Sequence, residues 1–259
     1  MRIVLVTQEE PFYLPLFTRL FLEKLKGNIV LVVGLSAVPP QENRFLMARR
    51  FLILWGARLF AYKLLRYSYY RILDSLPIQL GTAIYSSRRH CIRMHIPYIA
   101  PQSLKGAYAM ERIRACVPNL LVSVAANQIF SKELLSLPTL GCINLHASLL
   151  PRYRGINPTF WVLAKGEEIT GVTVHFMNEK FDDGDIILQR EISISKDDTL
   201  HSLYSKEIIL GLDLLCEAIS LLEKGSVPRK PNDSRYATYY SYPTRSSVKE
   251  FRERGRRFY

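Results

Sequence analysis

The sequence lacks the features that would place the protein in a membrane or in an oxidising compartment. It contains no uninterrupted apolar run of about 18 residues, so we expect no membrane-spanning helix. Its first residues, MRIVLV, lack the charged region, apolar stretch and small-residue cleavage site of a secretory signal. The four cysteines form no Cys-x-x-Cys pair and have no histidines at zinc-finger spacing, which favours reduced, mostly buried thiols. These absences predict a cytoplasmic protein.

Glycine-rich phosphate-binding turns are also missing. The first apolar run, Ile3 to Thr7, leads into the turn TQEEPFY, which contains no glycine. A dinucleotide-binding Gly-x-Gly-x-x-Gly turn and a Walker loop both require glycine at this kind of position. The sequence therefore excludes both sites after its first strand.

The net charge of +12 is concentrated in two segments. Residues 44–71 carry seven cations and no acid, and residues 245–257 carry six cations against two acids. The rest of the chain is therefore nearly neutral, and the basic character belongs to appendages of the main body.

The alternation of apolar patterns predicts an α/β protein. A helical pattern through Leu16, Leu20 and Leu25 separates the strand-like runs Ile3–Thr7 and Ile29–Val33, as in a βαβ unit. We expect a Rossmann-like, twisted, mainly parallel sheet with helices on both faces. The later elements expected are helices near 80–93, 107–116, from 131 and at 199–223, and strands at 97–100, 120–125, 142–146, 171–177 and 185–192.

Two segments stand apart from this pattern. We interpret residues 41–75 as an insertion of one or two helices within a main domain of residues 1–225. Residues 226–259 form a C-terminal extension, in which Val248 and Phe251 predict a short helix that docks on the body.

The basic, aromatic insertion has three explanations. It can be a nucleic-acid face, an interfacial helix for a membrane-linked substrate, or a packing or homo-oligomer contact, with a lid over the site as a further variant. At 100° per residue its arginines point all around the helix, which argues against a membrane-surface helix. We favour the packing or oligomer contact.

Polar residues that could take part in catalysis lie at the end of the strand-like run Cys142–His146. Asn144 and His146 close this run just before a loop punctuated by proline and glycine, where open α/β sheets collect ligands. Taken singly, such a histidine is more often structural, and Asp182 beside Gly184 is typical of a turn. A zinc site is disfavoured because asparagine is not among the usual zinc ligands.

The segments INLHASLLPRYRGINP (143–158) and TGVTVHFMNEKFDDGDIILQ (170–189) together resemble the folate-dependent formyltransferase family. Its Asn-x-His motif falls on Asn144 and His146, and its Leu-Asp-x-Gly motif falls on Phe181–Gly184, with Asp182 as the aspartate. The resemblance covers residues from about 120 to about 199, and implies transfer of a formyl group from 10-formyltetrahydrofolate to an amine, without a metal.

The expected chemistry suits these side chains. Attack of an amine on a formyl carbon produces an oxyanion and an excess proton on nitrogen. Asn144 and His146 can donate to the oxyanion, and Asp182 can polarise His146 and carry the proton.

By the same resemblance, the pterin ring of the donor should lie against backbone groups of two segments. One is Val124–Phe130 and the other is Met177–Asp183. His175 is left open between a strand role and a site role, and Asp183 and Asp185 are expected to be turn residues. The residues assigned to the donor are Asn127, Gln128, Ile129, Phe130, Met177, Asn178 and Glu179.

The acceptor is sought in the residues after the signature proline. Arg152, Tyr153 and Arg154 fit the Pro-Arg-x-Arg-Gly pattern of the tRNA and sugar enzymes, although a solvated basic loop explains them equally well. Trp161 follows Pro158 as in sugar-nucleotide formyltransferases. We therefore expect a small-molecule amine on an amino-sugar nucleotide.

Alternative acceptors and functions remain open. Roughly 35 residues follow the helix expected at 199–223, too few for the C-terminal barrel of methionyl-tRNA formyltransferases, yet the basic segments could still track RNA phosphates. Glycinamide ribonucleotide is disfavoured because residues 154–158 depart from that branch's Gly-Leu-x-x-His pattern. The rivals of other classes are a formyltetrahydrofolate hydrolase and a folate- or RNA-binding protein without activity.

Overall fold

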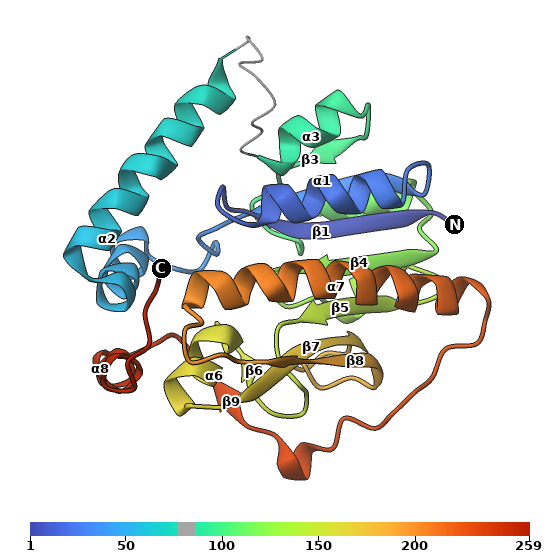
Figure 1. Ribbon diagram of the computed structural model, residues 1–259. Coiled ribbons are helices and arrows are strands. Elements are labelled where there is room, and N and C mark those ends of the chain that lie inside the picture. The colour runs from blue at the N-terminus through green and yellow to red at the C-terminus, as the bar shows by residue number, and fades with distance from the viewer. Residues whose placement is uncertain (77–85) are drawn as a thin grey trace.

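The computed structural model describes residues 1–76 and 86–259, and its centre is a seven-stranded sheet (Figure 1). The strand order is β3-β2-β1-β4-β5-β7-β8, with parallel pairing from β3 to β5 and antiparallel pairing of β7 and β8. The prediction of a Rossmann-like, mainly parallel α/β fold is confirmed. The strands are β1 Ile3–Glu9, β2 Ile29–Ser36, β3 Tyr98–Ile99, β4 Leu120–Val124, β5 Cys142–His146, β7 Ile169–Phe176 and β8 Ile186–Ser193.

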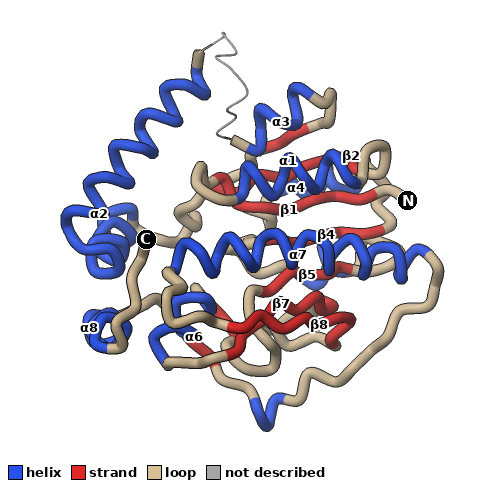
Figure 2. The backbone as a smooth tube through the Cα atoms, in the orientation of Figure 1, coloured by secondary structure: helices blue, strands red, loops and turns tan. Residues whose placement is uncertain are grey.

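Helices cover both faces of this sheet, because its central strands are apolar on both sides. Ile3 and Leu5 of β1 belong to the core shared with α1 and α7, whereas Val4 and Val6 belong to the core shared with α4 and α5. Figure 2 shows α1 and α7 side by side over one face. The helices packed on the sheet are α1 Leu14–Lys24, α3 Ser87–Arg93, α4 Ala107–Ala115, α5 Lys132–Leu135, α6 Pro158–Lys165 and α7 Leu200–Glu223.

The insertion forms a long helix, α2 Arg44–Ser75, that is broken in its middle. Gly56 has φ 75° and ψ 165°, so two helical segments meet there at an angle. The second segment extends away from the sheet (Figure 1). The helix expected near 80–93 begins at Ser87, and its first part, 80–85, lies outside the described residues.

The C-terminal extension returns to the body. Its strand β9 Tyr239–Tyr240 pairs in parallel with β6 Arg154–Gly155, directly after β5 in the sequence. The final helix, α8 Arg245–Glu253, buries Val248 and Phe251 against the core, which confirms the predicted docking. Among the described residues, no helix is both long and apolar enough to cross a membrane.

Candidate functional site

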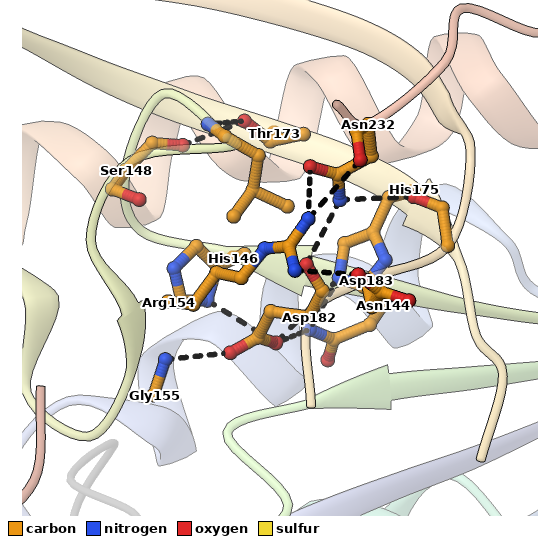
Figure 3. Close-up of polar contacts among 12 residues, drawn as sticks. Asn144, His146, Ser148, Arg154, Gly155, Thr173, His175, Asp182, Asp183 and Asn232 are labelled. Atoms are coloured by element: carbon orange, nitrogen blue, oxygen red, sulfur yellow. Dashed lines mark hydrogen bonds and ion pairs between the residues drawn. The ribbon is translucent and has the colours of Figure 1, made fainter. Parts of the chain in front are cut away.

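The sheet brings the predicted polar residues together at one point (Figure 3). Asn144 and His146 lie two residues apart on β5, so their side chains leave the same face of the strand. The antiparallel register places His175 of β7 opposite Asn144. Asp182 follows in the turn between β7 and β8, with a left-handed φ of 48°. Residues almost 40 positions apart thus share one cluster because β5 and β7 pair.

The two oxygens of the Asp182 carboxylate have different environments. Oδ2 accepts the backbone N–H of Gly155 at 2.8 Å. Oδ1 faces Asn144 Nδ2 and His146 Nδ1, each at 3.5 Å, and His175 Nε2 at 3.7 Å. Contacts of this length are looser than direct hydrogen bonds. Oδ1 is therefore the oxygen that can take a further proton donor.

The hydrogen bonds of His146 fix the role of its ring. Nε2 lies 2.9 Å from the carbonyl oxygen of Tyr153, and since a carbonyl only accepts, Nε2 carries a hydrogen. In the neutral ring, Nδ1 then presents its lone pair toward Asp182. Burial lowers the pKa of His146 below its usual value, although the nearby Asp182 carboxylate acts in the opposite direction. The ring is therefore held mainly neutral near pH 7.

Asp182 stays ionised in this environment. Burial raises the pKa of its carboxyl, but the adjacent imidazoles of His146 and His175, whose protonated forms would pair with the carboxylate, and the bond from the Gly155 N–H together outweigh burial. The net result is a pKa well below the usual range for aspartate. The site therefore combines a carboxylate with a neutral imidazole.

His175, which the sequence left open, belongs to the cluster. Its Nδ1 donates to the backbone carbonyl of Phe176 at 2.7 Å, which leaves Nε2 as an acceptor. Nε2 accepts one hydrogen of the Asn144 amide at 3.1 Å. His175 thereby fixes which end of the Asn144 amide faces Asp182. The pairing of Asn144 with His175 across β5 and β7 is the signal that could have identified His175 as a site residue.

Arg154 is placed differently from the expectation that it contacts an anionic acceptor. Its guanidinium is buried and donates to the carboxylate of Asp183, to Oδ1 of Asn232 at 2.8 Å and to Ser234 at 3.3 Å. Asn232 in turn donates to the backbone carbonyl of Asp182 at 2.8 Å. These bonds are internal, so Arg154 braces the Asp182 turn.

Asp183 and Asn232 also hold the turn that carries Asp182. Asp183 is a turn residue as expected, but it is also the ionic partner of Arg154. Asn232 lies 50 residues beyond Asp182 in the C-terminal extension, and no motif marks it in the sequence. Only the path of the extension brings it to the site.

The other residues assigned to the acceptor also attach the extension. Trp161 is buried, donates from Nε1 to the carbonyl of Ser241 at 2.9 Å and stacks on Tyr240 at 4.7 Å. Tyr153 also stacks on Tyr240, with ring centroids 5.3 Å apart, and its hydroxyl donates to Glu167. The indole of Trp161 is thus enclosed by the extension, and its contact with the acceptor stays a prediction.

Arg152 is the exposed member of this group. Its side chain is 54% exposed and pairs with Glu167. The guanidinium is thus on the surface and remains a candidate for acceptor contact.

Side chains in the first segment assigned to the donor are mostly used internally. Asn127 donates to the carbonyl of Ser36 at 2.8 Å, and Gln128 accepts the backbone N–H of Leu104 at 2.9 Å. Phe130 is buried in the core between the sheet and α4. Ile129 is exposed, so this segment offers mainly its backbone and Ile129 to a ligand.

The second donor segment borders an open hollow of about 430 Å³. Asn178 and Glu179 line it, and Met177 anchors the segment by donating its N–H to the carbonyl of Cys142 at 2.8 Å. The hollow also borders the turn that holds Asp182. Its lining residues are Lys132, Leu135, Ser136, Asn178, Glu179, Lys180 and Asp183.

Within residues 1–76 and 86–259, no group of His, Cys, Asp and Glu side chains has the arrangement of a metal site. The chemistry that these residues can perform themselves is hydrogen-bond donation from Asn144 and proton uptake at Asp182 or at Nδ1 of His146.

Comparison with known proteins gives a consistent family. Residues 77–219 match the model described as formyl transferase. The methionyl-tRNA formyltransferase of Clostridioides difficile (strain 630) is 39% identical over 148 residues, which are 57% of this chain and 48% of that protein. The chain thus spans about half the length of the curated relatives it matches.

Solved structures share the fold at lower identity. The N-formyltransferase from Helicobacter canadensis, solved in complex with folinic acid and dTDP-3-aminofucose, is 15% identical with a TM-score of 0.60, covering 93% of this chain and 71% of that chain. Glycinamide ribonucleotide transformylase 1 from Symbiobacterium toebii is 17% identical with a TM-score of 0.59, covering 90% of this chain and 95% of that chain. These likenesses show that the fold is common to all three.

Proposed function

Because the chain belongs to the formyl transferase family, we propose that it transfers a formyl group from 10-formyltetrahydrofolate to a primary amine. The observation that carries this proposal is the convergence of Asn144, His146 and His175 on Oδ1 of Asp182. A carboxylate, a neutral imidazole and an oriented amide at one point provide both a base and a donor.

The residues divide the reaction between them. The amine nitrogen forms a bond to the formyl carbon, and the bond from that carbon to the folate nitrogen breaks. One hydrogen of the Asn144 amide is held by His175, so the second, which meets Asp182 only at 3.5 Å, is free to stabilise the developing oxyanion. Asp182 takes the excess proton of the amine and delivers it to the departing folate nitrogen, which leaves the enzyme unchanged.

The hollow beside the Asp182 turn supports a site for the donor. It is bordered by Asn178, Glu179 and Asp183, and so lies next to the turn that carries Asp182. The backbone of residues 126–129 and the exposed Ile129 offer further contacts. In this proposal 10-formyltetrahydrofolate supplies only the formyl carbon, and the proton transfers belong to the protein.

Exposed aromatic rings favour an acceptor linked to a nucleotide. Phe181, which directly precedes Asp182, is 52% exposed, Tyr239 is 55% exposed, and their ring centroids lie 6.2 Å apart. Such rings stack well on nucleobases and on the apolar faces of sugars. We therefore propose an amino sugar carried on a nucleotide as the acceptor.

A second candidate acceptor is methionyl-tRNA. This acceptor is favoured by the curated relatives named methionyl-tRNA formyltransferase, whose similarity to this chain covers about half of each protein. The basic residues of α2 and of the C-terminal helix would then contact phosphates.

The test is to incubate the protein with 10-formyltetrahydrofolate and a panel of amines, and to follow the release of tetrahydrofolate. The panel contains a nucleotide-linked amino sugar, methionyl-tRNA and glycinamide ribonucleotide. Release that depends on the amino sugar, with a formylated product by mass spectrometry, is the expected result. Release of tetrahydrofolate with methionyl-tRNA alone would identify methionyl-tRNA as the acceptor and would leave the proposed formyl transfer unchanged.

Two other outcomes would overturn the reaction itself. Release without any amine would identify a hydrolase. Binding of the folate without release in the presence of every acceptor would identify a binding protein without activity.

A further inference from the structure

The second segment of α2, residues 57–75, is held firmly on its inner side. The ammonium of Lys63 is buried over the rings of Phe12 at 4.3 Å and Trp55 at 4.8 Å. At the other end, Asp74 forms an ion pair with Arg89 of α3 at 2.9 Å. The helix therefore has a fixed inner side and a fixed outer side, and does not rotate freely.

The outer side presents a row of apolar side chains to solvent. Leu65 is 72% exposed and Ile72 is 60% exposed, and their spacing of seven positions places both on one stripe of the helix. Leu64 is exposed next to this stripe. Large apolar residues grouped in this way mark a contact surface rather than ordinary scatter.

Basic residues border this stripe without any acid to balance them. Arg58 is exposed seven residues before Leu65, at the end of the row formed by Leu65 and Ile72, and Arg71 is exposed beside this row, on the same side as Leu64. The one acid in the sequence of residues 44–76 is Asp74, which is already paired with Arg89. The outer face is therefore apolar along its row, with positive charge at one end and along one side.

In the sequence, arginines that point all around the helix argue against a membrane-surface helix. The kink at Gly56 and the inner contacts of the second segment remove this objection. Arginines spread all around a straight helix would prevent a clean apolar face. In the structure Lys63 faces the body, and Arg66 bonds to the hydroxyls of Tyr62 and Tyr70. Only Arg58 and Arg71 remain as exposed cations around the apolar row of this segment.

We propose that this outer face of α2 binds the surface of an anionic phospholipid bilayer. Leu64, Leu65 and Ile72 would enter the boundary between headgroups and acyl chains, while Arg58 and Arg71 contact lipid phosphates. A second copy of the chain fits less well, because pairing of two such faces brings the like-charged arginines together. Nucleic acid fits less well because it offers nothing to the apolar row.

This proposal is independent of the formyl-transfer proposal, and its test does not use activity. The protein is mixed with vesicles of phosphatidylcholine containing phosphatidylglycerol, and with vesicles of phosphatidylcholine alone, and binding is measured by flotation. We expect binding to the anionic vesicles that weakens at high salt, because exposed charges are screened. Arg58→Ala/Arg71→Ala should weaken it roughly 20- to 30-fold, at about fivefold for each arginine.

A matched pair of substitutions separates this face from general stickiness. Ile72→Glu should reduce binding by about tenfold or more, whereas Ile209→Glu, at a similarly exposed site on α7, should leave it unchanged. Circular dichroism of both variants checks that they fold.

Three results would overturn the proposal. One is the absence of binding to the anionic vesicles. Another is equal loss of binding in both glutamate variants. The third is a dimer of the free protein, detected by sedimentation, that Ile72→Glu dissociates, since the face would then be covered by a second copy.

Discussion

Gly155 donates its backbone N–H to Oδ2 of Asp182 at 2.8 Å, and so ties the proposed catalytic carboxylate to strand β6. β6 is itself paired with β9 of the C-terminal extension, where Gly155 lies opposite Tyr240. Gly155 has a φ of 99° and a Cβ there would lie 2.3 Å from the Tyr240 carbonyl, so the position requires glycine. The extension thus helps to orient the carboxylate, although it lies far from the motif in sequence.

Replacement of Asp182 tests its role as the base. Asp182→Asn keeps an oxygen for the Gly155 N–H but removes the negative charge. We expect turnover to fall by about 100- to 10,000-fold, because a positioned acid or base contributes that much. Binding of the folate donor, measured by calorimetry, should change little. Near-normal turnover in this variant would remove Asp182 from its assigned role.

Asn144 and His175 should differ in the size of their effects. Asn144→Ala removes a donor to the oxyanion, and we expect a fall in turnover of about 100- to 1,000-fold. His175→Phe leaves the donor in place but loses the acceptor that orients it, so roughly a 10- to 100-fold fall is expected. The measurement is kcat at saturating donor and acceptor. If the His175 variant lost more than the Asn144 variant, His175 would have to act directly.

The buried and exposed arginines of the loop after β5 provide a matched pair for stability. Arg154→Lys loses the forked bonds to Asp183 and Asn232, and we expect about 3 kcal/mol of destabilisation. In a chain of this size the melting temperature should fall by roughly 6–12 °C. Arg152→Ala removes an exposed pair with Glu167 and should cost under about 1 kcal/mol. Equal effects in thermal denaturation would contradict the internal role of Arg154.

Glu207 gives a prediction about the pH dependence of stability. Its side chain is buried on α7, where burial raises the pKa well above the usual value and Thr159 donates to Oε2 at 2.6 Å. The unfolded chain loses this proton near pH 4.3, while the folded protein keeps it to higher pH. The folded state therefore binds more protons in that window, and stability falls as the pH rises through it.

The corresponding experiment compares the melting temperatures of two glutamate-to-glutamine variants with that of the unchanged protein. Glu207→Gln cannot ionise, so the fall in melting temperature between about pH 5 and pH 8 should become smaller than in the unchanged protein. Glu179→Gln, at an exposed position, serves as the control and should keep the original slope. The same slope in all three proteins would mean that Glu207 does not carry a raised pKa.

The sequence by itself determined the fold class and three members of the central cluster, Asn144, His146 and Asp182. A strand such as Leu120–Val124, apolar at every position but Ser123, is expected to be buried on both sides, which favours a parallel sheet covered by helices. Asn144 and His146 stand at fixed spacing on one strand, so local geometry already places them together. The Asp182 turn was found through its motif, which is also local.

Only the tertiary structure decided which side chains are free and which are used to hold the site. Arg154 and Trp161 are residue types that often bind ligands. Here the C-terminal extension folds over them, and their N–H groups donate to Asn232 and Ser241 of the extension. Asn232 reaches the Asp182 turn across 50 residues, and the exposed row on α2 exists because Gly56 breaks the helix and Lys63 faces inward. Such long-range contacts depend on the path of the whole chain, which no local pattern of residues encodes.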